Sequence, residues 1–354
     1  MSQKRYVLLD GFRGLAALYV VLSHVGGETF HGLQWGNLRV DFFFVLSGFV
    51  LQPRVPQAGE GAWIQARKFI RSRVFRLWPM LVTILVARLA IWGIWMLKNP
   101  NQPASEFGII DFPTSLIAAV LLLQIVIPSA MEWGDPLWSL SAEWLTNIGV
   151  ALGGIALGKF VWPFIFVSGY ACLFMGSLSD TPVNLGFGAL GRALVGFSLG
   201  AIVRQINDRY VRTFWLPRFA LALGLTLGIF LVQIVWHRSA LPIAAIVLAF
   251  FVAEVVTINQ SKIPSSILRV ASYLGTVSFG VYAWHNNFIK LISSELLPVV
   301  PLNVGHQSVL EVIKISAIVV AMSIVATHAT SRYIEKPIQS RWGKKRTASV
   351  EVAA

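Results

Sequence analysis

Cysteine and charge are both scarce in this sequence. Its 354 residues include a single cysteine, Cys172, so the chain can form neither an intramolecular disulfide nor a cysteine-based zinc site. Charged residues make up 13% of the chain, about half the share found in an average soluble domain. This scarcity of charge excludes a disordered protein, a collagen-like protein and an ordinary cytosolic protein.

Apolar side chains, by contrast, are abundant. They make up 56% of the residues, and the chain also contains 13 Trp and 23 Phe. One or two water-soluble cores could not bury that much apolar surface. The composition therefore predicts a protein whose main solvent is lipid.

The apolar residues are gathered into eleven runs along the chain. A membrane-spanning helix needs about 20 mainly apolar residues. Backbone groups in lipid must be hydrogen-bonded within the protein, and these runs are too long for barrel strands, so we expect helices. The fold class predicted is an all-α, polytopic membrane helix bundle. The runs cover residues 6–26, 38–51, 77–97, 113–127, 137–157, 161–178, 187–203, 219–236, 241–258, 272–292 and 309–328.

The distribution of basic residues predicts the topology. They cluster in 4–5, 54–76, 204–218, 262–269 and 332–346, which the positive-inside rule places in the cytoplasm together with Lys159. Both termini are then cytoplasmic, which requires an even number of crossings. The weakest run, 113–127, is expected to be re-entrant or packed on the outer side. We therefore predict about ten transmembrane helices in an integral-membrane domain, 1–340, followed by a disordered cytoplasmic basic tail, 341–354.

The net charge of +13 bears on the expected partners. In a membrane protein such an excess reports topology and contact with anionic headgroups before it reports nucleic acid. Membrane lipids are therefore expected partners, and nucleic acid is not. The string GFGALG at 186–191 matches a dinucleotide fingerprint, but it follows no predicted strand, so we expect no dinucleotide cofactor and no metal.

The first apolar run contains the sharpest candidate site. Charged groups inside a span are costly and by default mark a site. Arg13 and His24 are eleven residues apart, about 1100° of helical rotation, so they share a face about 16 Å apart along the axis. Asp10 can pair with Arg13 from one turn away. In one interpretation, Arg13 binds a ligand near the cytoplasm and His24 acts as general base toward a hydroxyl. In the other, Asp10 and Arg13 form a structural ion pair and His24 caps the end of the helix.

A basic stretch precedes the third apolar run. At helical spacing, the arginines and lysine of 67–76 form a basic face at the inner membrane surface. This face either anchors lipid headgroups or forms a cradle for a polyanionic cytosolic donor. Arg71, Arg73 and Arg76 are the candidate donor-binding residues.

Further candidates lie toward the predicted outer side. Glu143 lies inside a span and needs a partner, for which Arg39 or His24 are candidates. Candidate acceptor-side residues are Asp41, Trp138, Ser139 and His285. The tryptophan also fits an ordinary interfacial belt, and the histidine also fits a satisfied helix interface.

Several segments, taken in order, resemble the membrane-bound acyltransferase 3 family of bacterial O-acyltransferases. The resemblance extends over nearly the whole chain. It rests on the Arg13 to His24 spacing, DFFFVLSGF at 41–49, the arginines before Leu77, Trp78 and Pro79, WSLSAE at 138–143, SFGVYAWH at 278–285 and YIEKP at 333–337.

The resemblance implies an integral enzyme of the bacterial inner membrane. Such an enzyme takes an acyl group from cytosolic acyl-CoA, commonly acetyl-CoA, and places it on a hydroxyl of an extracytoplasmic carbohydrate or lipid-linked glycan, with no tightly bound cofactor. Arg13 and His24 match the family's hallmark pair. Arg13 is then expected to bind the donor phosphates or to stabilise the thioester oxyanion, and His24 to act as general base on the acceptor hydroxyl or as a transient acyl carrier. Asp10 and Glu143 are the other two residues of the predicted catalytic set. A transporter or flippase, with Asp10, Arg13, Glu143 and His285 as a proton relay, is the rival interpretation, and a non-catalytic membrane partner is a third.

Overall fold

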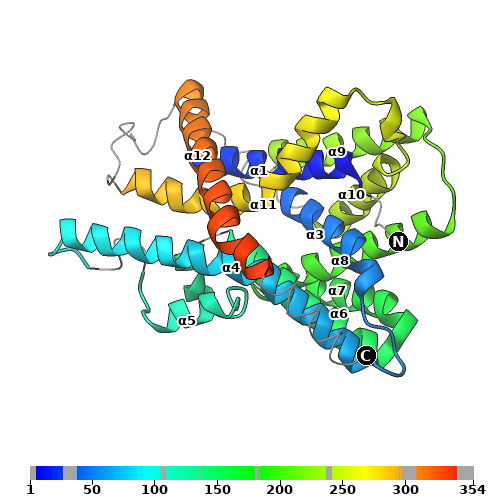
Figure 1. Cartoon of the computed structure of the whole chain (residues 1–354), viewed down its shortest axis with the longest axis horizontal. Helices are drawn as coiled ribbons and strands as arrows, with labels where there is room; N and C mark the ends of the chain where they lie inside the picture. The colour runs from blue at the N-terminus through cyan, green and yellow to red at the C-terminus, as the bar shows by residue number, and fades with distance from the viewer. Residues whose placement is uncertain are drawn as a thin grey trace.

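A computed structural model describes most of the chain. The described residues are 5–26, 38–103, 105, 109–134, 136–179, 182, 184–236, 241–294, 296 and 308–340, without the side chains of 233–236, 241 and 242. Over these residues the regular structure is helical and contains no strand, which confirms the all-α prediction (Figure 1). The predicted basic tail, 341–354, lies outside the described residues.

The helices follow the apolar runs closely. Ten runs each form a helix over most of their length, because each supplies enough apolar surface for neighbours to pack against. The helices are α1 (Val7–Val25), α3 (Leu38–Leu51), α4 (Ala62–Lys98), α5 (Thr114–Val120), α6 (Leu137–Leu157), α7 (Val161–Ser177), α8 (Gly186–Arg209), α9 (Leu216–Trp236), α10 (Leu241–Val255), α11 (Ser265–Ser293) and α12 (Val309–Thr330).

Helices α4 and α5 differ from their apolar runs in ways that bear on the topology. Helix α4 has 37 residues, because the basic stretch and the following apolar run form one continuous helix that contains Pro79. Its ribbon changes direction along its length, as an internal proline causes (Figure 1). Helix α5 has only 7 residues. At about 1.5 Å per residue it is too short to cross a membrane, in agreement with the prediction for 113–127.

The membrane topology is only partly tested by the structure. Among the described residues, five helical stretches are long and apolar enough to cross a membrane: Val7–Val25, Ala62–Lys98, Leu137–Ser177, Gly186–Arg209 and Val309–Ser340. The parts of α9 and α10 whose side chains are described, Leu216–Val232 and Ile243–Val255, are apolar but shorter. The count of ten crossings and the cytoplasmic termini stay predictions.

The irregular segment after α5 is buried against α6. Leu122 and Ile125 are both buried. The hydroxyl of Ser141 donates to the Leu122 carbonyl at 2.7 Å and accepts from the Ile125 amide at 3.3 Å. Non-helical backbone is tolerated at membrane depth where protein groups satisfy it, as Ser141 does here.

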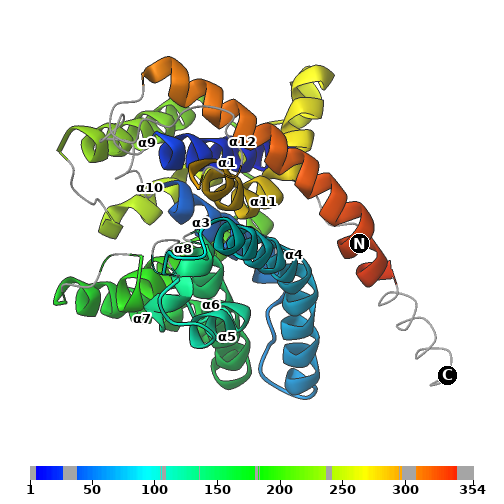
Figure 2. The same ribbon diagram turned by 90° about the vertical axis from the view of Figure 1, so that its left-hand side faces the viewer.

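Helices α1 and α11 lie side by side and run parallel (Figures 1 and 2). A Cβ added to Gly11 would lie 2.7 Å from that of Ala271, and one added to Gly14 would overlap Leu274. On the other helix, a Cβ at Gly275 would overlap Asp10. These glycines therefore let the two backbones approach closely, as small residues do in membrane helix pairs.

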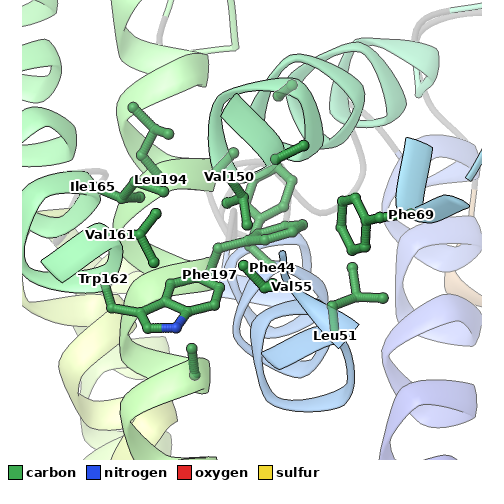
Figure 3. Close-up of a cluster of buried hydrophobic side chains, with 14 of the residues drawn as sticks. Phe44, Leu51, Val55, Phe69, Val150, Val161, Trp162, Ile165, Leu194 and Phe197 are labelled. Carbon is green, nitrogen blue, oxygen red and sulfur yellow. The ribbon is translucent and has the colours of Figure 1, made fainter. Parts of the chain in front are cut away.

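A buried apolar cluster supports the other side of the bundle. Figure 3 shows side chains of α3, α4, α6, α7 and α8 gathered there, including Phe44, Phe69, Val150, Trp162 and Phe197. Phe44 is 2% exposed and Phe197 is 1% exposed. Phe44 also contributes to the wall of the cavity described next, so this core fixes one side of that wall.

Candidate active site

A cavity of about 430 Å³ lies between α1, α3, α4, α6, α8 and α11. It brings together six of the residues predicted from the sequence, which come from three separate helices. These are Asp10, Arg13, Arg73, Arg76, Ser139 and Glu143. Arg5 and Arg204 also line it, so the described lining has five arginines and two carboxylates. Such a lining attracts a polyanion.

Arg13 is held in the cavity wall by α11. Its Nε donates to the Ser278 hydroxyl at 2.9 Å, and its Nη2 donates to the Gly275 carbonyl. The predicted pair with Asp10 is present, at 3.8 Å between Nη2 and Oδ1, and Asp10 also accepts from Arg5 at 2.9 Å. The guanidinium is therefore fixed in orientation by neighbours on both helices.

The partners of Glu143 differ from those expected. Arg39 and His24 were the predicted partners, and that prediction is wrong. The half-buried carboxylate of Glu143 interacts electrostatically with Arg76, Arg73 and Arg13 instead. The reason is that α6 faces the basic end of α4 across the cavity. Arg39 is placed with its guanidinium 5.1 Å from the centre of the Tyr19 ring.

The basic stretch divides into two groups. Arg73 and Arg76, one turn apart on α4, both line the cavity; Arg73 is 4% exposed, whereas Arg76 is exposed. Arg71 does not line the cavity, and its guanidinium lies 5.9 Å from the centre of the Phe75 ring. Arg204 of α8 also lines the cavity. In the sequence it was used only to predict the membrane topology.

His24 lies beyond the described lining of the cavity, next to His285. The centres of the two rings are 5.0 Å apart. Nδ1 of His24 is 2.8 Å from the Val20 carbonyl, and Nδ1 of His285 is 2.6 Å from the Tyr282 carbonyl. Because a carbonyl only accepts, each Nδ1 carries the proton, and the lone pair of each neutral ring is on Nε2. The chemistry available there is that of a base.

A stripe on α11 links these two regions. Gly275, Ser278, Tyr282 and His285 recur at spacings of three and four, which places them on one face. The first two contact Arg13, and the last contacts His24, so Arg13 and His24 share a face of α1 as predicted. The stripe spans about 15 Å along α11.

Tyr282 was missed in the sequence and occupies the middle of this stripe. It lines the cavity, and its ring centre is 6.1 Å from that of His285. Its hydroxyl donates to the Pro136 carbonyl at 2.8 Å and lies 2.6 Å from the hydroxyl of Ser139. The available signal was the spacing of three residues to His285, which places both side chains on one helix face.

The two remaining acceptor-side candidates belong to a buried cluster outside the cavity lining. Oδ1 of Asp41 accepts from Nε of Arg192 at 2.8 Å, and both side chains are buried. The Arg192 guanidinium lies 5.0 Å from the centre of the Trp138 ring. Trp138 thus covers the ion pair between α3 and α8.

The residues present suit phosphate groups better than a metal ion. Arginines line the cavity, and arginine binds phosphate in a bidentate manner. Within the described part of the chain, no three His, Cys, Asp or Glu residues gather in a way that could hold a metal ion.

Several characterised proteins are similar to this chain. Protein 2 in picA locus of Rhizobium radiobacter is 32% identical over 167 residues, 44% of this chain and 86% of that protein. Acyltransferase MdmB of Streptomyces mycarofaciens is 30% identical over 38% of this chain and 35% of that protein. Peptidoglycan O-acetyltransferase OatA of Listeria monocytogenes is 23% identical over 96% of this chain. The chain spans 56% of the length of the Listeria protein. No solved structure matches significantly.

The family comparison covers most of the chain. The family model for the acyltransferase domain matches residues 6–328, a range that includes all the residues lining the cavity except Arg5 and also includes both histidines of the pair. The five apolar helical stretches found among the described residues, together with the family match, indicate a multi-pass membrane protein. The chain therefore belongs to the acyltransferase 3 family, whose resemblance was noted in its sequence.

Proposed function

We propose that this protein transfers an acyl group, and acetyl in particular, from cytosolic acyl-CoA to a hydroxyl of an extracytoplasmic carbohydrate or lipid-linked glycan. The observation that carries the proposal is the cavity itself. It has arginines at one end and Tyr282 at the other, and Tyr282 adjoins the pair of His24 and His285.

The basic end of the cavity suits the phosphates of coenzyme A. Arg73, Arg76 and Arg204 offer several N–H donors with fixed positive charge, and charge-assisted bonds from arginine to phosphate are among the stronger hydrogen bonds. The pantetheine arm then follows the apolar wall formed by Phe43, Leu140 and similar residues. Because these arginines belong to segments expected in the cytoplasm, the donor enters from that side.

Arg13 and His24 act on different parts of the substrates. The Arg13 guanidinium is bonded to Ser278, whereas the His24 ring lies beside His285, seven residues or about 10 Å further along α11, so the two groups cannot contact the same carbonyl group. Arg13, held by Ser278 and Gly275, serves the phosphate or pantetheine part of the donor. His24, with its lone pair on Nε2, serves the acceptor hydroxyl.

The proposed reaction is direct transfer with His24 as general base. The acceptor oxygen attacks the thioester carbon and a C–O bond forms, while Nε2 of His24 takes the hydroxyl proton and the carbonyl electron pair moves to oxygen. As the C=O bond re-forms, the C–S bond breaks. The thiolate leaves and takes the proton from His24, which gives free coenzyme A and the acylated acceptor.

The acceptor class and the location rest on the relatives and the charge distribution. OatA of Listeria is named a peptidoglycan O-acetyltransferase, which favours a glycan hydroxyl here. The positive-inside pattern supports a location in a bacterial inner membrane, with the basic end of the cavity toward the cytoplasm and the histidine pair toward the opposite face.

Purified protein in lipid vesicles, supplied with labelled acetyl-CoA and glycan acceptors, tests the proposal. We expect transfer of label to the acceptor by wild type and loss of transfer in His24→Ala. His328→Ala on α12, whose histidine contacts Tyr273, is the matched control and should stay active. In cells, mass spectrometry of surface glycans should show one acetyl mass difference. Movement of solute or protons without any acyl transfer would overturn the proposal in favour of a transporter.

A further inference from the structure

We propose that the hydroxyls of Tyr282 and Ser139 bind the carbonyl oxygen of the donor thioester and stabilise its negative charge in the transition state. This inference rests on the acyl transfer proposed above and names the group that completes it. The site is the end of the cavity next to the histidine pair, where both side chains line the wall.

The position of Tyr282 along the path fits the carbonyl of a bound thioester. Arg13 is bonded to Ser278, which lies one helical turn, about 6 Å, before Tyr282 on α11. His285, which contacts His24, follows three residues later. Tyr282 is therefore placed between the residue that holds the donor and the base that activates the acceptor.

The tyrosine ring is held in a fixed orientation. It packs edge-on against Phe43, with ring centres 5.4 Å apart, and it is only 5% exposed. Its hydroxyl is anchored to the first turn of α6 through Pro136 and Ser139. Donors held in place before the reaction are the ones that stabilise developing charge most effectively.

The two hydroxyls of Tyr282 and Ser139 have one more hydrogen than the Pro136 carbonyl needs. Tyr282 and Ser139 each have one hydroxyl hydrogen, and their shared acceptor is the Pro136 carbonyl, at 2.8 Å and 3.1 Å. One hydrogen satisfies that carbonyl, and the other is shared between the two hydroxyls, 2.6 Å apart. A thioester oxygen entering the cavity can accept this second hydrogen while Pro136 keeps the first. No buried group then loses its partner.

Positive charge nearby supports the same role. The Arg39 guanidinium, half-buried on α3, lies 5.1 Å from the centre of the Tyr19 ring and within electrostatic range of the Tyr282 hydroxyl. A fixed cation stabilises an oxyanion more strongly in a water-poor site than in water. When the acceptor oxygen adds to the carbonyl carbon, the π pair moves onto this oxygen, and its hydrogen bond to the hydroxyls strengthens.

The decisive variant is Tyr282→Phe, which keeps the ring and removes the hydroxyl. We expect kcat to fall by about 10²- to 10³-fold, the usual loss for one oxyanion donor. The KM for acetyl-CoA should stay near the wild-type value. An S-alkyl coenzyme A thioether, which lacks the thioester carbonyl, should bind variant and wild type equally. Tyr273→Phe on the same helix is the matched control, since that hydroxyl contacts His328 away from the cavity.

The outcomes separate this inference from the proposed function. Wild type with no acyl transfer would contradict the function itself. If wild type is active and Tyr282→Phe has a similar kcat, only the role of Tyr282 is overturned. Weaker thioether binding in proportion to the loss of kcat would show a structural role and would overturn it too. If Tyr282→Phe does not fold, Ser139→Ala carries the test, because it too leaves a single hydroxyl hydrogen, which the Pro136 carbonyl takes. A comparable fall in kcat with unchanged thioether binding supports the inference, and unchanged kcat contradicts it.

Discussion

The imidazole rings of His24 and His285 lie with their centres 5.0 Å apart, one on α1 and one on the parallel α11. Each ring donates through Nδ1 to a carbonyl of its own helix, so each neutral ring has its lone pair on Nε2. Nε2 of His285 is buried and has no hydrogen-bond partner among the described residues. If His24 is the general base proposed above, an acceptor of this kind beside it stabilises the proton that it takes up.

This pairing predicts the effect of His285→Phe. The substitution keeps an aromatic ring and removes the Nε2 acceptor beside His24, so a protonated His24 loses a polar neighbour that can accept a hydrogen bond. A hydrogen bond to a charged group contributes about 1.5–3 kcal/mol, so we expect kcat to fall by at most about 10- to 100-fold. Steady-state kinetics in lipid vesicles measures it, with His328→Ala as control. Full activity of His285→Phe would show that His24 acts without its neighbour.

Arg13→Lys tests the geometry of the donor site. Lysine keeps the charge but lacks the planar fork that bonds Ser278 and Gly275 together. We expect kcat/KM for acetyl-CoA to fall at least about tenfold, since one misplaced or lost charged hydrogen bond costs at least that much. A lysine variant as active as wild type would mean that positive charge alone is required at this position.

Arg73→Gln and Arg76→Gln should weaken donor binding. Each removes a charge that faces the cavity, so we expect a higher KM for acetyl-CoA and a weaker dependence of KM on salt. Arg67→Gln on the same helix, whose side chain is exposed and lies outside the cavity lining, is the control for loss of one basic charge. Equal KM changes in all three variants would indicate a general effect of charge at the membrane surface.

Asp41→Asn should destabilise the fold. Arg192 and Asp41 have side chains 1% and 3% exposed, so the substitution leaves a buried charge without its counter-ion. We expect a loss of about 3–5 kcal/mol in unfolding free energy, seen as a lower thermal midpoint in detergent. Asp208→Asn breaks the more exposed pair with Arg204 and should cost at most about 1 kcal/mol. Similar midpoints for both variants would contradict the difference in burial.

The sequence was sufficient to predict most of the helices. Apolar runs mark where lipid-compatible helices form, and α3 and α6 have the predicted bounds because both follow a single uninterrupted run. The start of α4 was not predicted, since its first 15 residues include five basic ones and were interpreted as a stretch at the membrane surface. Helix formation continues there because no proline or glycine interrupts it before Pro79.

Contacts within one helix were predictable, whereas contacts between helices were not. The spacing of Arg13 and His24 correctly indicated a shared face, because rotation per residue is fixed by the helix. The predicted partners of Glu143 were wrong, because the packing of α6 against α4, and the cavity that both share with α1, decide which charges it meets. Tyr282 and Arg204 were missed for the same reason: nothing in their local sequence tells which helix lies opposite.

The close contact between α1 and α11 sets a length. At Gly11, Gly14 and Gly275 the backbone of one helix lies directly against residues of the other. A shift of one helix along the other would bring side chains into these contacts and cause steric clashes. The distance between the Arg13 and His24 side chains is therefore fixed by their contacts with α11 as well as by their spacing on α1. This fixed distance selects donors by length. We expect it to favour thioesters whose anionic end and reactive carbon are separated by that interval, and to use poorly a short thioester that has no nucleotide end for Arg13 to hold.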